Sequence, residues 1–164
     1  MDLLWSELVF GFGDWRDFGR VIIRLTAATI FGAAIGIERE SAGKAAGVRT
    51  HMLVTLGTAA FVIACSRGEF SNEGLSRVIQ GVVTGIGFIG AGSIIKSSDA
   101  MDVRGLTTSA GIWMAAAIGV AVGLGAVGFA AVATVFALLI LTFAVMIDNR
   151  ITKGRFTREK PTDD

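Results

Sequence analysis

An uncharged stretch near the C-terminal end limits the possible folds of this chain more than any other feature. It runs from Leu106 to Ile147, 42 positions without an acidic or basic residue. A single helix of that length would measure about 63 Å, roughly twice the thickness of the hydrocarbon core of a bilayer. The stretch therefore has to fold back, and glycines between Gly123 and Gly128 lower the cost of a turn. We predict membrane helices over 106–123 and 127–147.

Three more apolar runs lie upstream of this stretch. Residues 78–95 are uncharged, and residues 21–37 contain only one charge, Arg24. Residues 52–66 form a shorter run, which spans a bilayer only if flanking side chains snorkel or the helix extends into its neighbours. The sequence therefore predicts about five transmembrane helices.

The composition agrees with a membrane protein. Hydrophobic residues make up 52% of the chain and charged residues 18%, whereas a typical soluble domain has about a quarter charged residues. We expect an all-α polytopic helix bundle over residues 19–147. Residues 1–18, with aromatic rings among acidic residues, are predicted to lie at the membrane interface, and residues 148–164 to form a short basic tail.

The distribution of Lys and Arg predicts the orientation. With five spans, the loops at 38–51 and 96–105 and the C-terminal tail share one side, and together they hold ten basic residues. The N-terminal segment and the 66–77 loop share the other side with four. The positive-inside rule then places the N-terminus outside and the C-terminus in the cytoplasm.

Two charged loops, 36–51 and 96–108, meet on the predicted cytoplasmic face. A charge at the end of a span needs a partner because an unpaired buried charge is costly. We expect Glu38 and Asp102 to pair with neighbouring arginines, although ordinary solvated loop charges would give the same pattern. For the single histidine, a hydrogen-bonded structural imidazole is favoured over a pH sensor or a metal ligand. The candidate functional residues are Glu38, Arg39, Arg49, His51, Asp102 and Arg104.

Glycines recur four residues apart within the predicted spans. Gly85 to Gly90 matches the dinucleotide-binding pattern G-x-G-x-x-G, but that motif needs a strand before it and a soluble helix after it. Small residues let membrane helices approach closely, either within one chain or between chains. The residues assigned to helix packing are Gly32, Gly36, Gly81, Gly85, Gly92, Gly119 and Gly123.

Reactive side chains are sparse. Arg24 lies about one turn inside the first span, and we favour snorkelling of its side chain to the outer surface over a role in an ion path. One His and one Cys supply neither a nucleophile–base pair nor a metal-ligand spacing, and the last three spans contain no carboxylate. We therefore expect no enzyme activity, no cofactor and no metal site. The net charge of +1 disfavours a nucleic-acid partner.

Several segments resemble the MgtC/SapB family of bacterial inner-membrane proteins, in order and at family-like spacing. They are Gly36–Glu40, Ala46–Val54, Gly85–Gly92 and Val103–Thr108, with Trp113 beyond. The resemblance implies a multi-pass protein of the bacterial inner (plasma) membrane, linked to magnesium limitation, acid stress or survival inside host cells. Longer members of the family carry a cytoplasmic ACT-like domain. Here only 17 residues follow the last predicted span, as expected for a short, membrane-only form.

Two functions from different classes stay open. The favoured one is a regulatory protein that acts through interaction with other membrane proteins, such as the ATP synthase or sensor kinases that the resemblance implies. The alternative is a transporter or channel for Mg²⁺ or another small solute. The expected partners are the lipid bilayer, other membrane proteins and a second copy of the chain in a homo-oligomer.

Overall fold

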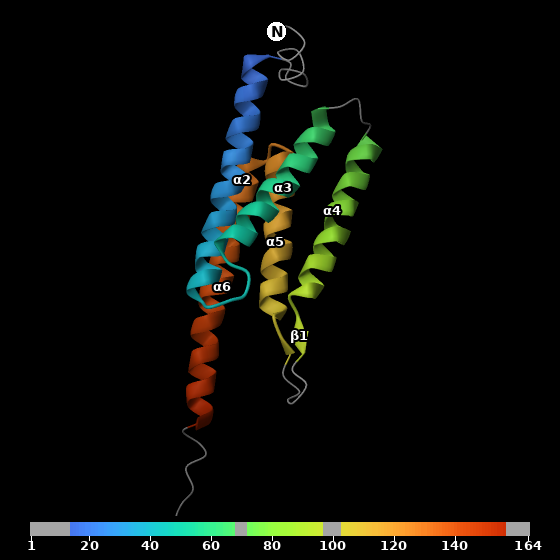
Figure 1. The fold of residues 1–164 in the computed structure, drawn as a ribbon. Coiled ribbons are helices and arrows are strands. Elements are labelled where there is room, and N and C mark those ends of the chain that lie inside the picture. Colours follow the sequence, from blue (N-terminus) through green and yellow to red (C-terminus); the bar gives the residue numbers. More distant parts are fainter. Residues whose placement is uncertain (1–13, 68–71, 97–102, 157–164) are drawn as a thin grey trace, which may run out of the picture.

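The computed structural model describes residues 14–67, 72–96 and 103–156, and the described part contains five helices (Figure 1). Side chains are described as far as Phe143, except around the 95–102 segment. The helices are α2 (Trp15–Ser41), α3 (Val48–Arg67), α4 (Asn72–Gly92), α5 (Leu106–Gly123) and α6 (Val127–Phe156).

Successive helices run in opposite directions, so the connections gather at two ends of the bundle (Figure 1). One end carries the α2–α3 loop and a two-stranded ladder of β1 (Ile95–Lys96) and β2 (Val103–Arg104), and we call it the loop face. The other end carries the start of α2 and the turn between α5 and α6, and we call it the turn face. This alternation is the one that the sequence predicted.

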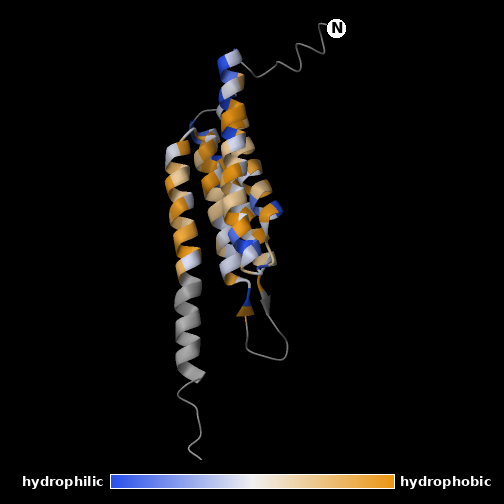
Figure 2. Cartoon of the chain, turned by 90° about the vertical axis from the view of Figure 1, so that its left-hand side faces the viewer, coloured by the Kyte–Doolittle hydropathy of each residue, from blue (hydrophilic) through white to orange (hydrophobic). Residues whose placement is uncertain are grey.

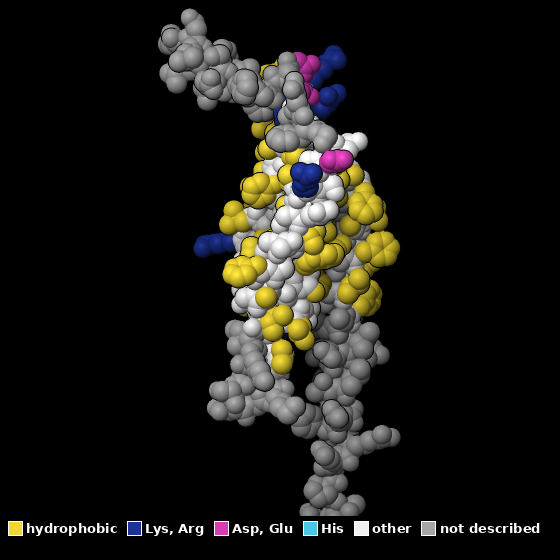
Figure 3. Space-filling view, turned by 90° about the vertical axis from the view of Figure 1, so that its right-hand side faces the viewer, with side chains coloured by type: hydrophobic (Ala, Val, Ile, Leu, Met, Phe, Trp, Pro, Cys, Tyr) yellow, Lys and Arg dark blue, Asp and Glu magenta, His cyan; other side chains and the backbone are white. Residues whose placement is uncertain are grey.

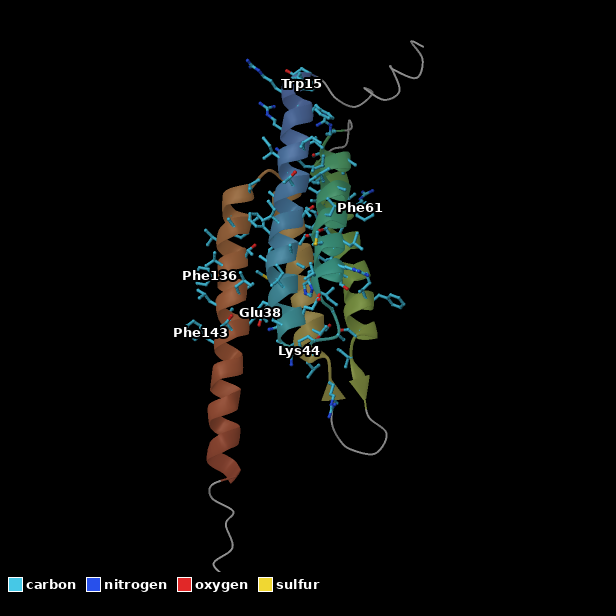
Figure 4. All side chains as sticks on the ribbon, turned by 60° about the vertical axis from the view of Figure 1, so that its left-hand side comes forward. Trp15, Glu38, Lys44, Phe61, Phe136 and Phe143 are labelled. Atoms are coloured by element: carbon cyan, nitrogen blue, oxygen red, sulfur yellow. The ribbon has the colours of Figure 1, made fainter. Side chains whose placement is uncertain are left out.

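Hydrophobic residues predominate along the helices (Figure 2), and many of the large ones are exposed on the outside of the bundle, as a bilayer requires. Four helices, α2 to α5, are long and apolar enough to cross a membrane, and α6 contributes the apolar stretch Val127–Phe143 within its described side chains. Large hydrophobic side chains such as Phe61, Phe136 and Phe143 point away from the bundle (Figure 4). The predicted all-α membrane bundle is confirmed.

The helix ends differ from the limits of the apolar runs. Helix α2 begins at Trp15, six residues before the first apolar run, because Asp14 caps it by accepting a hydrogen bond of 2.7 Å from the Asp17 amide. The predicted boundary at residue 18 therefore falls inside this helix. Residues 148–156, predicted as part of a tail, continue α6 as helix. Capping groups and backbone hydrogen bonds decide where a helix ends, and hydrophobicity does not report them.

Two glycines shape the connections of α5. Gly125 has a φ of 87° and makes the turn to α6 at the position where the sequence predicted a break. Gly105 has a φ of 96° directly before α5, and a methyl group there would collide with the backbone of Ser93. The β1–β2 ladder that leads into Gly105 is not predicted by the sequence, because the uncharged run over 78–95 predicts a helix along its whole length.

The seven glycines assigned to helix packing divide into two groups. Methyl groups at Gly32, Gly36, Gly119 or Gly123 would collide with a neighbouring helix, so these four lie where helices touch. The other three, Gly81, Gly85 and Gly92, all lie on α4, and no other described helix comes within 4 Å of the methyl position. The core is accordingly built around α2, α3 and α5, with α4 packed loosely at its side.

Candidate functional site at the junction of α2, α3 and α5

Close contact between α2 and α3 creates a buried junction near the loop face. A methyl group at Gly36 would lie 2.5 Å from Val48 Cα, and one at Gly32 would lie 2.6 Å from the His51 carbonyl oxygen. Only glycine leaves space for this approach of two backbones. One turn beyond Gly36 on the same face of α2 is Arg39, which the contact therefore buries.

Arg39 is the most unusual residue of the junction because its charged side chain is only 1% exposed. It forms a bidentate ion pair with Glu38, in which Nε donates to one carboxylate oxygen and Nη2 donates to the other at 2.7 Å. The Glu38 side chain is 19% exposed, and it therefore links the buried guanidinium to the loop face. This is one of the ion pairs that the sequence led us to expect.

His51 is completely buried beside this ion pair. Its Nδ1 lies 2.9 Å from the carbonyl oxygen of Gly47, so Nδ1 carries a proton and donates it to that oxygen. Its Nε2 has no hydrogen-bond partner within the described part of the chain and faces Gly111 of α5. A methyl group at Gly111 would lie 3.4 Å from Nε2 and 3.9 Å from Arg39 Cδ, so the three helices meet at this glycine.

Buried threonines continue the polar side of α3 into the bundle. The hydroxyl of Thr55 donates to the backbone carbonyl of His51 at 3.0 Å, and that of Thr58 donates to the carbonyl of Val54 at 2.8 Å. Each hydroxyl is thus satisfied by its own helix rather than by a neighbouring polar group. These two threonine hydroxyls therefore bond to backbone carbonyls of α3 itself.

The α2–α3 loop above the junction is held in one conformation. The carboxylate of Glu40 accepts a hydrogen bond of 3.0 Å from the amide of Val48, which supplies the first turn of α3 with a partner and a favourable negative charge. The amides of Ala42, Gly43 and Lys44 donate to the last carbonyls of α2. The loop therefore presents the exposed side chain of Lys44 on a braced backbone (Figure 4).

The six predicted site residues do not form one cluster. Glu38, Arg39 and His51 meet at the junction. The side chains of Arg49 and Arg104 are exposed on the loop face, the first in the initial turn of α3 and the second on β2. Asp102 lies outside the described residues, so its expected ion pair stays a prediction.

Sequence reasoning missed three further residues of the site: Glu40, Gly47 and Gly111. An acidic residue eight positions before the start of α3 gives no local signal, because its role depends on how the loop folds back. Gly111 is one of many glycines in an apolar span, and only the crossing of three helices distinguishes it. Among the described residues, no group of three or more His, Cys, Asp or Glu side chains could hold a metal ion.

Comparison with known proteins gives a consistent family. The profile described as "MgtC family" matches residues 25–150. The protein named "Putative magnesium transporter YhiD" of Escherichia coli K12 is 43% identical over 141 residues, which cover 78% of this chain and 65% of YhiD. Protein SrpB of Synechococcus elongatus is 40% identical over 79% of this chain and 76% of its own length.

The matched region is a part of several of these relatives. Protein MgtC of Brucella abortus is 42% identical over 122 residues, which are 74% of this chain but only 50% of that protein. The chain thus spans between half and about two thirds of the length of YhiD and of this MgtC protein. No solved structure matches the chain. The family profile covers most of the chain and includes the residues of the junction, and this chain therefore belongs to the MgtC family.

Proposed function

We propose that this protein is a non-catalytic regulator of the bacterial inner membrane, which binds other membrane proteins through its loop face during adaptation to low magnesium or acid stress. In this proposal the N-terminus lies outside and the loop face lies in the cytoplasm, as the excess of Lys and Arg on that side suggests. The family membership supports a membrane protein of this type.

The observation that carries the proposal is the braced basic surface above a buried ion pair. Lys44, Arg49 and Arg104 are exposed on the loop face. The backbone beneath Lys44 is fixed by the Glu40 cap, and the junction beneath it is fixed by the buried Arg39. A surface that is already ordered loses little conformational entropy when it binds a partner, and its positive charge attracts acidic partner surfaces.

The test neutralises the surface without touching the junction. A bacterium that lacks its own copy of this protein would receive the protein or its Lys44→Gln/Arg49→Gln variant, and growth at low Mg²⁺ would be measured. The matched control is Arg16→Gln, an equally exposed change at the turn face. We expect the double variant to lose the growth benefit and at least half of its cross-linked protein partners at unchanged membrane level, while the control keeps both. Loss in neither variant would refute a role for this surface.

A second candidate function is transport of magnesium, and the name of the relative YhiD, a putative magnesium transporter, is the observation that favours it. The two candidates differ in a direct measurement, Mg²⁺ uptake into liposomes that contain only this protein. Our proposal expects uptake no faster than in protein-free liposomes. Saturable uptake that is lost in an Arg104→Ala variant would replace regulation by transport as the function.

A further inference from the structure

We propose that a second copy of this chain packs against the outer face of α4, so that the protein is a dimer whose two α4 helices cross. This proposal concerns a different surface from the loop face and does not depend on the regulatory function. Its evidence is the pattern of exposed residues along α4.

Pairs of exposed residues follow one another along α4 at intervals of four. The pairs are Ser76 with Arg77, Gln80 with Gly81, and Thr84 with Gly85, and the large residues Phe88 and Ile89 continue the series; toward the end of the helix Val83 and Gly87, each directly before a pair, are exposed as well. Rows of residues four apart are the ridges that pack together when two helices cross at a right-handed angle of about 40–50°. The face that α4 turns outward is thus organised like a helix-crossing surface.

The centre of this face is hollow. Gly81 and Gly85 line a groove of about 380 Å³ between α3 and α4, with Thr58 and Phe61 on its α3 side. No other described helix comes within 4 Å of the methyl position of either glycine. In Figure 3, which views the molecule from the side of α4, a white area of backbone and non-hydrophobic side chains lies between the yellow hydrophobic side chains. Two glycines one turn apart are the usual contact point of a close helix pair.

Polar groups on the same face favour protein over lipid as the occupant. Gln80 is exposed within the uncharged run of α4, and its amide nitrogen lies 3.5 Å from Ser76 Oγ, at the limit of a hydrogen bond. An amide group in contact with hydrocarbon is costly, whereas between two helices it can hydrogen-bond across the contact. Lipid tails would leave the remaining amide hydrogen and carbonyl oxygen of Gln80 without partners.

Charge complementarity favours a second copy over an unrelated helix. Glu73 and Arg77 stand one turn apart on the same ridge, with side chains 85% and 80% exposed, and within one chain Arg77 Nη2 lies 3.9 Å from a carboxylate oxygen of Glu73, near the limit of an ion pair. Two copies inserted in the same direction are related by a two-fold axis along the membrane normal, and their α4 helices run parallel. Glu73 of each copy then comes within reach of the partner's Arg77, so a single face supplies both halves of two ion pairs.

Cysteine cross-linking in membranes tests the contact directly. The native thiol of Cys65 would first be removed by Cys65→Ala, after which Thr84→Cys is compared with Val135→Cys, a similarly exposed position on α6. We expect oxidation to convert most of the Thr84→Cys protein into a species of twice the mass, and less than a tenth of the Val135→Cys protein. A cross-linked product of any other mass, or none from either variant, would overturn the proposal.

Two sets of variants then test the geometry. Gly85→Leu is expected to reduce the cross-linking of the Thr84 cysteine at least fivefold, whereas Gly128→Leu is not, although both glycines have free space around them. Charge reversal by Glu73→Arg or Arg77→Glu alone should weaken dimerisation, and the two reversals together should restore it. Equal effects of the two leucine variants, or no restoration by the double reversal, would contradict the crossing of α4 with its copy.

Discussion

The ion pair between Glu38 and Arg39 fixes a positive charge where three helices meet, and the two partners contribute unequally. Arg39 is almost fully buried, whereas Glu38 reaches the loop face. Removing the carboxylate by Glu38→Gln leaves a buried guanidinium without its counter-charge, which costs about 3–5 kcal/mol in comparable pairs. We expect this variant to be the least stable one at the junction, measured by thermal unfolding in detergent micelles.

The companion variant removes both charges. Replacing an ion pair with apolar groups of similar size is often neutral. Glu38→Met/Arg39→Met should therefore be more stable than Glu38→Gln, although it carries one more substitution. A double variant less stable than the single one would mean that Arg39 stabilises the junction through contacts other than its carboxylate partner.

Arg24 is a second partly buried arginine with a specific partner, at the turn face. Its Nη1 donates a hydrogen bond of 3.1 Å to the carbonyl oxygen of Gly123, at the C-terminal end of α5, where the helix dipole favours a cation. The side chain thus points to the turn face, where it has a specific backbone acceptor, and its snorkelling to the outer surface stays a prediction. Arg24→Met should lower the free energy of unfolding by about 1–2 kcal/mol. Arg20→Met, at an exposed position on the same helix, should change it by less than about 0.5 kcal/mol.

The same substitution, glycine to alanine, can be compared at two positions of helix α5. A methyl group at Gly119 would lie 2.5 Å from the carbonyl oxygen of Thr55, and backbone atoms cannot move aside easily. A methyl group at Gly111 would make only an ordinary contact of 3.4 Å with His51. Gly119→Ala should therefore cost about 1–3 kcal/mol or more as an overpacked contact, and Gly111→Ala less than about 1 kcal/mol.

Thermal unfolding compares the stability of the two alanine variants, and their levels in the membrane give a second readout. Because both variants replace glycine by alanine in the same helix, they share the same gain in helix propensity. The difference between them reports the space around each residue alone. Equal stability would show that α3 and α5 can separate at Gly119 without cost.

The elements were predictable where hydrophobic length alone decides the structure. The break near Gly125 followed from an uncharged stretch too long for one span, and the weak run over 52–66 became a span because α3 extends to Val48 and Arg67. The β1–β2 ladder and the burial of Arg39 were not predictable in the same way. Both depend on groups distant in sequence, such as Ser93 facing Gly105 or Gly111 facing His51, which no local pattern reports.

The glycines of α4 also show what a local sequence pattern does not predict. Its glycines follow the same four-residue spacing as those of α2 and α5, and the sequence assigned them all to helix packing. Gly32 and Gly119 do pack within the chain, but Gly81 and Gly85 face outward. A pattern of small residues indicates that two helices can approach closely. Only the arrangement of the helices decides whether the neighbouring helix belongs to the same chain.

At the scale of the whole molecule, the direction of insertion decides which side of the membrane the loop face and the turn face lie on. The loop face and the C-terminal segment together hold ten of the Lys and Arg residues outside the spans, against four at the turn face. Basic residues near the ends of spans are retained on the cytoplasmic side during insertion. We therefore expect a fluorescent protein fused after residue 164 to be fluorescent in the cytoplasm, and alkaline phosphatase fused there to be inactive.

The same fusions placed at the turn face give the matched control. Alkaline phosphatase inserted at Leu124, in the exposed turn between α5 and α6, should be active because our proposal places that end of the bundle outside. The opposite activities at both positions would show that the orientation is reversed. Lys44 and Arg49 would then lie out of reach of cytoplasmic partners. A dimer through α4 would survive such a reversal, because two copies inserted in either shared direction keep their α4 helices parallel. Orientation and dimerisation are thus separate properties of the same bundle, and each can fail without the other.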